Sequence, residues 1–307
     1  MIIFVDENDE NTRLDNYLSG MFDNISRSKI QNFIKNGSIL VNNCTKKPSY
    51  TLKQGDKIEF EKLENEELKI EPQNIPLEII YEDENMLVVN KPSGMLTHPT
   101  SIERENTLVN ALLYKYGDNL SDINGEFRRG IIHRLDRNTS GLLMIAKNNK
   151  AHEFLAQQIK DHTITKKYRA ILKGNYNGDE DRIDLPIGRH PKQPHKMAIV
   201  PVKDGGKESI TLLKVLERFK EATYVELTLI TGRTHQIRVH MSHMRHPVYN
   251  DTLYGAGEGR VKTQEQVLQS YYLKFTKPFT NDIIELEIEP DEKINKVLTY
   301  YRNRRTK

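Results

Sequence analysis

The chain has 307 residues, of which 36% are hydrophobic and 29% are charged, and its formal net charge is +3. This composition is typical of a soluble globular protein, and no apolar run approaches the roughly 20 residues that span a bilayer. The single cysteine, Cys44, excludes an internal disulfide and a zinc site built from several cysteines. The first residues lack the basic and apolar regions of a secretion signal. We therefore expect a cytoplasmic protein without a membrane partner.

Residues 12–60 predict a small α/β module with two helices followed by short strands. Thr12 is placed to cap the first helix, and Ser26 to cap a second helix that ends at Gly37. Apolar residues recur at helical spacing after both caps. The expected strands are SILVNN and DKIEF. A module of this size can bury only a small core by itself.

An acidic stretch separates this module from the rest of the chain. Residues 61–84 carry nine acidic residues and two lysines, and Pro72 lies among them. Proline disfavours regular structure at such a position. We therefore divide the chain into an amino-terminal module over residues 1–62, an acidic linker over 63–74 and a larger domain over 75–307.

The larger domain is predicted to be of the α+β class. Helices are expected in NTLVNALLYKYG, with Asn106 as the cap and Gly117 as the stop, and in KAHEFLAQQIKDH. Several strands follow one another without an intervening helix, which favours a mixed, largely antiparallel central sheet with flanking helices over a doubly wound sheet. The expected strands are LEIIY, MLVVN, GLLMIAK, YRAILKG, ESITLLKVLE, TYVELTLI and IIELEIE.

The segment HRLDRNTSGL (133–142) places one carboxylate, Asp136, between Arg134 and Arg137. Residues 128–150 contain six lysines and arginines and only this one acid. Because an acid weakens the binding of any polyanion, Asp136 is either structural or performs chemistry on a molecule that the arginines hold. Basic segments beside an acidic belt favour a polyanionic partner, and ordinary solvated charge is the alternative.

A partner for Asp136 is expected in GRTHQIRVHM, which offers Arg233 and Arg238. If residues 236–241 form a helix or a strand, one of these arginines can face inward, and a buried arginine needs a carboxylate. Such a pair would favour the ionised carboxylate, and a purely structural ion pair is the alternative. Tyr168, in TKKYRAIL, either stacks on a base beside the basic surface or belongs to the core.

Four histidines lie close together in THQIRVHMSHMRHP, at His235, His240, His243 and His246. Imidazole is a common metal ligand, but no Asp or Glu lies among these histidines, and the arginines between them would repel a cation. We expect polar structural roles for them and no bound metal. The phosphate-binding pattern GxxxxGK[ST] and the nucleophile pattern GxSxG are both absent.

Together these motifs resemble the ribosomal large-subunit type of pseudouridine synthase. The segments that carry the resemblance occur in the family's order and span nearly all of the larger domain. They are YEDENMLVVNKPSGMLTHP (81–99), HRLDRNTSGLLMIAK (133–147), TKKYRAILKG (165–174) and TGRTHQIRVHMSHMRHPVYNDTLYG (231–255). The amino-terminal module, with RLDNYL, SRSKIQNFIKNGSILVN and LKQGDKI, resembles an S4 RNA-binding domain. It departs from the S4 pattern at Asn43-Cys44, where a glycine is more usual.

The resemblance implies that the protein isomerises uridine in RNA to pseudouridine. The base is detached from C1′, turned and rejoined through C5, with no cofactor, metal or energy source. Asp136 matches the essential aspartate of the family and Arg238 its arginine partner. Tyr168 matches the tyrosine that packs on the target base, and Arg134 the residue that fills the space left by the flipped nucleotide.

The resemblance favours large-subunit 23S ribosomal RNA as the partner of a monomeric enzyme, with transfer RNA as the alternative substrate. A non-catalytic RNA-binding or ribosome-assembly protein on the same fold is an alternative function, but the intact set of Asp136, Tyr168 and Arg238 argues against it. A metal-dependent nuclease or hydrolase is a further alternative, which the lack of clustered carboxylates opposes. Further RNA contacts are expected from Arg137, Arg233, His235, Arg27, Lys29 and Lys35.

Overall fold

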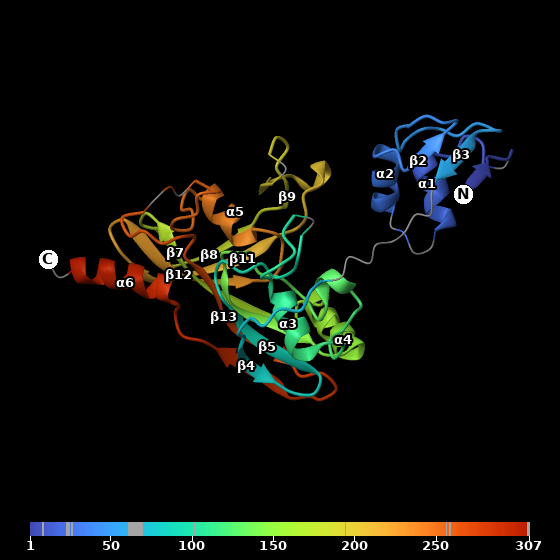
Figure 1. Ribbon diagram of the computed structural model, residues 1–307. Coiled ribbons are helices and arrows are strands. Elements are labelled where there is room, and N and C mark those ends of the chain that lie inside the picture. Colours follow the sequence, from blue (N-terminus) through green and yellow to red (C-terminus); the bar gives the residue numbers. More distant parts are fainter. Residues whose placement is uncertain are drawn as a thin grey trace. The chain divides into compact units, whose positions relative to one another are not determined.

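The computed structural model describes residues 1–7, 9–22, 25, 27–60, 70–100, 102–193, 195–255, 257 and 259–305. The chain divides into two compact units, Met1–Lys69 and Ile70–Lys307 (Figure 1). Most of the predicted linker falls on residues 61–69, which lie outside the described residues, and residues 70–77 contain no helix or strand. None of the described helices combines the length and the apolar character that crossing a membrane requires.

The amino-terminal unit packs two helices against a small antiparallel sheet. The helices are α1 (Leu14–Met21) and α2 (Arg27–Lys35), and the strands are β1 (Ile2–Phe4), β2 (Ile39–Val41) and β3 (Lys57–Phe60), in the order β1-β3-β2. One core joins both helices to the sheet through buried leucine, isoleucine and valine side chains. The predicted α/β module is therefore confirmed, and β1 is an additional strand that the sequence pattern did not indicate.

The capping residues predicted for this unit need one correction. Arg13, rather than Thr12, occupies the N-cap position of α1, and no side chain caps that helix. Instead, the free backbone N–H groups of Leu14 and Asp15 donate to carbonyl oxygens of the segment 48–50, which satisfies them as a cap would. Ser26 lies outside the described residues. Gly37 adopts a φ of +83°, two residues after α2 ends.

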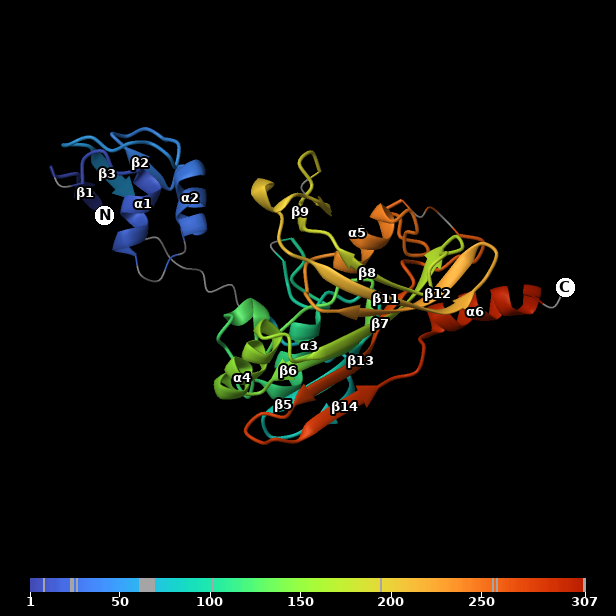
Figure 2. The same ribbon diagram turned by 180° about the vertical axis from the view of Figure 1, so that it is seen from behind.

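The larger unit is built on a nine-stranded mixed sheet with the order β4-β5-β6-β13-β7-β12-β11-β8, and β14 pairs with β13. Figure 2 shows β13 between β6 and β7. Only β6 and β13 pair in parallel among the described strands. The strands are β4 (Glu78–Glu82), β5 (Met86–Lys91), β6 (Ser140–Ala146), β7 (Thr165–Lys173), β8 (Glu180–Asp184), β11 (Ile210–Arg218), β12 (Ala222–Leu229), β13 (Leu268–Thr276) and β14 (Ile283–Glu287). This arrangement confirms the predicted fold class.

Helices cover both faces of the sheet. The helices are α3 (Leu108–Tyr116), α4 (Asn149–Lys160), α5 (Gln236–His243) and α6 (Glu292–Arg305). Leu143 and Ile145 of β6 share a core with α3 and α5, whereas Leu142 and Met144 share another with α4. Both faces of β6 are therefore buried, which explains why its sequence is continuously apolar rather than alternating. The helix α6 packs on a third cluster that includes Ile171 of β7.

The predicted start of α3 is also wrong by one residue. Thr107 is the N-cap, and it forms a reciprocal capping box with Asn110. Asn106 instead has a φ of +57° and donates its backbone N–H to the Gln73 side chain at 2.6 Å. Gly117 ends the helix as predicted. A short antiparallel arm, β9 (Ile187–Arg189) with β10 (Met197–Ile199), stands apart from the main sheet.

Gly141 is the position where only glycine fits the parallel pairing of β6 with β13. Its φ is +118°, and a Cβ built on it would lie 2.0 Å from the carbonyl oxygen of Ser270. Gly141 and Ser270 are paired in register. The absence of a side chain at Gly141 therefore allows β13 to lie beside the segment that follows Asp136.

We predict that Gly141→Ala lowers the free energy of unfolding by about 3 kcal/mol or more, because it adds a backbone clash to an unfavourable φ. Urea denaturation monitored by circular dichroism measures this change. Gly117→Ala is the matched control, since Gly117 has a φ of +53° but nothing within 4 Å of the added carbon. Equal losses in the two variants would contradict the proposed clash.

Candidate active site

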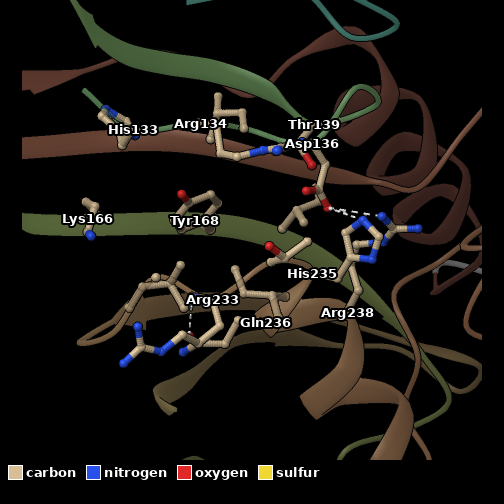
Figure 3. Close-up of a pocket in the computed structure, with 16 residues that line it drawn as sticks. His133, Arg134, Asp136, Thr139, Lys166, Tyr168, Arg233, His235, Gln236 and Arg238 are labelled. Atoms are coloured by element: carbon tan, nitrogen blue, oxygen red, sulfur yellow. Dashed lines mark hydrogen bonds and ion pairs between the residues drawn. The ribbon is translucent and has the colours of Figure 1, made fainter. Parts of the chain in front are cut away.

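A pocket lies where the turn before β6, the strand β7 and the start of α5 meet (Figure 3). It is lined by residues of the segments 133–139 and 232–238, by Lys166 and Tyr168 of β7, and by Leu229 and Leu268. These segments belong to three of the four motifs that the sequence singled out. The structure thus brings Asp136, Tyr168 and Arg238 to one cavity, although they are far apart in the chain.

Arg238 is held between two carboxylates. Its Nε and Nη2 atoms donate to Asp251 at 2.7 and 3.0 Å, and its Nη1 atom donates to Oδ2 of Asp136 at 3.0 Å. Burial opposes the charge of Arg238, but the hydrogen bonds and charges of Asp251 and Asp136 outweigh it and raise the pKa of the guanidinium. A permanently charged arginine therefore faces Asp136 from the first turns of α5.

The two carboxylates around Arg238 differ in their surroundings. The Asp251 side chain is 0% exposed and makes a two-point contact with the guanidinium, whereas the Asp136 side chain is 17% exposed and faces the pocket. Asp251 thus fixes the plane of the guanidinium, and Asp136 keeps an accessible oxygen. Asp251 was not among the residues predicted for the site. It is the only acid in residues 231–255, the same signal that drew attention to Asp136.

His235 approaches the same oxygen of Asp136 as Arg238 does (Figure 3). Its Nε2 atom lies 3.8 Å from Oδ2 of Asp136, and its Nδ1 atom lies 2.7 Å from the hydroxyl of Tyr254. That hydroxyl also accepts the backbone N–H of Met197 at 3.0 Å. Burial lowers the pKa of His235, which favours a neutral ring beside Asp136.

Tyr168 forms the wall of the pocket along β7. Its side chain faces the cavity, only 7% of the residue is exposed, and burial raises the pKa of its hydroxyl to about 12. The phenol is therefore protonated at neutral pH. A flat ring that is rigidly held in a central strand offers a surface on which a planar group can pack.

Two lysines, one buried and one half-buried, hold the backbone of the turn that carries Asp136. The Lys91 ammonium donates to the carbonyl oxygen of Arg137 at 3.1 Å and to those of Pro92 and Met95 at 2.8 Å. Lys293, in α6, donates to the carbonyl oxygen of Asn138 at 3.0 Å. These contacts explain why the motif at residues 81–99 and the motif at 133–147 belong to one site.

The remaining predicted contact residues are placed as follows. Arg134 and Arg233 are exposed and line the pocket, whereas Arg137 is exposed outside it and pairs with Glu103. In the amino-terminal unit, Arg27 pairs with the buried Asp15 at 3.0 Å. Lys29 lies 5.8 Å from the centre of the Phe33 ring, and Lys35 is exposed at the end of α2.

The clustered histidines have structural contacts. His240 is buried, with its ring nitrogens 2.9 Å from the hydroxyl of Thr211 and 2.9 Å from the carbonyl oxygen of Leu185. His246 lies 3.0 Å from the carbonyl oxygen of Lys173. Within the described ranges, no group of three or more His, Cys, Asp or Glu side chains is arranged to hold a metal ion. The prediction that the protein uses no metal or cofactor stays a prediction.

Comparison with known proteins places both units in families. The model of the RNA pseudouridylate synthase family matches residues 85–243, and that of the S4 domain matches residues 12–58. A Bacillus subtilis protein named uncharacterized RNA pseudouridine synthase YlyB is 41% identical over 93% of this chain and 92% of its own length. Ribosomal large subunit pseudouridine synthase D of Zymomonas mobilis is 39% identical over 90% of both chains. The solved structure of human RNA pseudouridylate synthase domain containing 1 has a TM-score of 0.56 and 26% identity, over 75% of this chain and 96% of that chain.

We predict that Asp251→Asn lowers the free energy of unfolding by about 3 kcal/mol, because it leaves the buried Arg238 without its two-point partner. Urea denaturation at pH 7 measures the loss. Glu221→Gln is the matched control, since it removes the charge from an exposed pair with Arg260 and should change stability far less. A similar, small effect in both variants would show that Asp251 does not compensate the buried charge.

Proposed function

This chain belongs to the RNA pseudouridylate synthase family, and we propose that its pocket isomerises uridines of large-subunit ribosomal RNA with Asp136 as the nucleophile. Membership makes the protein an RNA pseudouridine synthase, an isomerase that acts without changing the composition of its substrate. The observation that carries our proposal is the Asp136 carboxylate, which is paired with a fixed arginine and still open to the pocket.

The pairing with Arg238 positions Asp136 for nucleophilic chemistry. A nucleophile must be a carboxylate rather than a carboxylic acid, and the Arg238 guanidinium donates to Oδ2 of Asp136 at 3.0 Å. Because Asp251 binds two of the guanidinium donors, Arg238 stays directed at Asp136 and cannot follow a substrate away from it. The second oxygen of Asp136 remains for the ribose or the base.

The reaction is balanced within one nucleotide. The bond from C1′ to N1 breaks, the base turns, the bond from C1′ to C5 forms, C5 loses a proton and N1 gains one. In our proposal, Asp136 assists the departure of the base and Tyr168 supports the base while it turns. The Tyr168 phenol, whose pKa is raised to about 12, stays protonated and can donate a hydrogen bond.

The target uridine has to leave the stacked RNA to reach this pocket, which costs a few kcal/mol. Arg134 is placed to offset part of that cost. It is exposed at the pocket rim, and the structure shows no ion pair for it among the described residues. We propose that its side chain enters the space that the flipped nucleotide leaves, while Arg137, Arg233 and His235 contact the surrounding RNA.

Two observations support ribosomal RNA as the substrate. Relatives at 39% and 38% identity, from Zymomonas mobilis and Escherichia coli, bear the name ribosomal large subunit pseudouridine synthase D. The amino-terminal unit matches the S4 domain model, and its helix α2 presents Arg27, Lys29 and Lys35. We propose that this unit binds phosphates and adds affinity for a large, folded RNA.

We predict that Asp136→Asn abolishes pseudouridine formation but retains the fold and RNA affinity, because it removes the nucleophilic oxygen and leaves Arg238 paired with Asp251. Mass spectrometry of a 23S ribosomal RNA transcript and of a transfer RNA transcript measures the product and distinguishes the substrates. Asp161→Asn, at the exposed end of α4, is the matched control and should be as active as wild type. Turnover near wild type by Asp136→Asn would refute the assigned nucleophile.

We also predict that replacing both Lys29 and Lys35 with methionine weakens RNA binding and makes it less sensitive to salt. Each lost phosphate contact should reduce the slope of log K against log salt by about 0.7 to 0.9. Filter binding between low and moderate salt measures both quantities. Lys57→Met, which removes a lysine paired with Glu59 at 2.6 Å, is the control. An unchanged slope in the double variant would mean that α2 does not contact phosphates.

A further inference from the structure

We propose that the Lys166 ammonium binds a phosphate that flanks the target uridine, as a second anchor in the pocket that contains Asp136. The proposal rests on the proposed function, since it takes this pocket as the place where the uridine reacts. It assigns a role in substrate positioning to Lys166, and it requires no contact between Lys166 and the reacting atoms.

Lys166 and Tyr168 lie on the same face of β7. Side chains two residues apart in a strand point to the same side, and both line the pocket, whereas Lys167 between them points away and pairs with Glu226 at 3.1 Å. Two strand residues span about 6.6 Å. In Figure 3, Tyr168 lies between Lys166 and Asp136. A nucleotide that packs on Tyr168 therefore has Asp136 toward one end of the pocket and Lys166 toward the other.

The charge of Lys166 has no partner among the described residues. Only 7% of the residue is exposed, yet its ammonium makes no hydrogen bond or ion pair with them. Lys91 is also buried and Lys293 is half-buried, but each donates to three oxygen atoms of the protein. Burial lowers the pKa of all three amines, and only in Lys166 does no protein acceptor offset that cost.

The approach to the Lys166 ammonium is open because residue 232 is a glycine. A Cβ built on Gly232 would lie 3.6 Å from Nζ of Lys166, in ordinary contact. Gly232 itself is exposed and belongs to the pocket wall. A larger side chain at this position would cover the ammonium. The glycine leaves that space for a ligand atom.

A phosphate is the RNA group that best matches this site. A buried cation without a counter-ion is stabilised most by a full negative charge, and each nucleotide of RNA carries that charge on the phosphates next to its sugar. A uracil carbonyl offers only a partial charge. The proposed chemistry holds the ribose near Asp136, and our proposal places one of the two phosphates joined to that ribose, rather than the edge of the base, beside Lys166.

We test the proposal with Lys166→Met, using Lys167→Met as the matched control and Lys166→Arg as the conservative variant. Binding of a 23S ribosomal RNA transcript is measured against salt concentration. Lys166→Met is expected to bind more weakly, with a slope reduced by about 0.7 to 0.9, and Lys166→Arg is expected to restore the slope. Lys167→Met should match wild type. An unchanged slope in Lys166→Met, with or without weaker binding, would overturn the phosphate contact.

A stability measurement excludes a merely structural role. Removing an unpaired buried charge should leave the melting temperature of Lys166→Met equal to or above that of wild type, whereas loss of a structural contact would lower it. A synthetic RNA with a neutral methylphosphonate on either side of the target uridine completes the test. At one of the two positions, wild type should lose affinity and Lys166→Met should lose none. Equal losses in the two proteins would contradict the proposal.

The same experiments separate this inference from the proposed function. Asp136→Asn is assayed on the same transcript. If that variant is inactive while Lys166→Met binds like Lys167→Met, only the phosphate contact fails. If Asp136→Asn is active, the assignment of this pocket as the active site is refuted, and the proposal for Lys166 is refuted with it.

Discussion

The site depends on one buried guanidinium that two carboxylates share. Asp251 compensates the buried charge of Arg238, and Arg238 in turn binds Oδ2 of the Asp136 carboxylate at the pocket. The free-energy cost of burying these charges is offset only while the hydrogen bonds of Arg238 with Asp136 and Asp251 keep their distances and directions. The surrounding structure therefore has to fix the turn that carries Asp136, the first turns of α5 and the segment around Asp251 at the same time.

The fold fixes these segments by hydrogen bonds from side chains to the backbone of the turn and by the pairing of β6 with β13. Lys91 and Lys293 donate to the two consecutive carbonyl oxygens that follow Asp136, those of Arg137 and Asn138. The two lysines lie about 200 residues apart in the sequence. Gly141 lets the following strand lie against β13, the central strand added late in the chain. With both faces of β6 buried, this part of the sheet has little freedom to shift. The pocket is thus preorganised before RNA binds.

Much of this could be predicted from the sequence, and what was missed has physical reasons. Residues 141–147 gave a clear strand because apolar residues fill both faces, and Asp136 stood out as a lone acid in a basic segment. The strand β13 (LQSYYLKFT) mixes polar and aromatic residues, and it is a strand because β6 and β7 pair with it, which is a long-range effect. Asp251, like Asp136, is the only acid in a basic segment. Its role was not predicted because its contact with Arg238, 13 residues away, forms only in the folded chain. The cap of α3 moved to Thr107 because Asn110 completes the capping box there.

The measurement that tests the central claim most directly is a pseudouridine map of ribosomal and transfer RNA from cells with and without this gene. Carbodiimide treatment followed by reverse transcription locates each modified position. We expect specific pseudouridines to disappear from large-subunit ribosomal RNA in the deletion strain and to return with the wild-type gene, but not with a gene encoding Asp136→Asn. Restoration by the Asp136→Asn gene would contradict the account, and so would a change confined to transfer RNA.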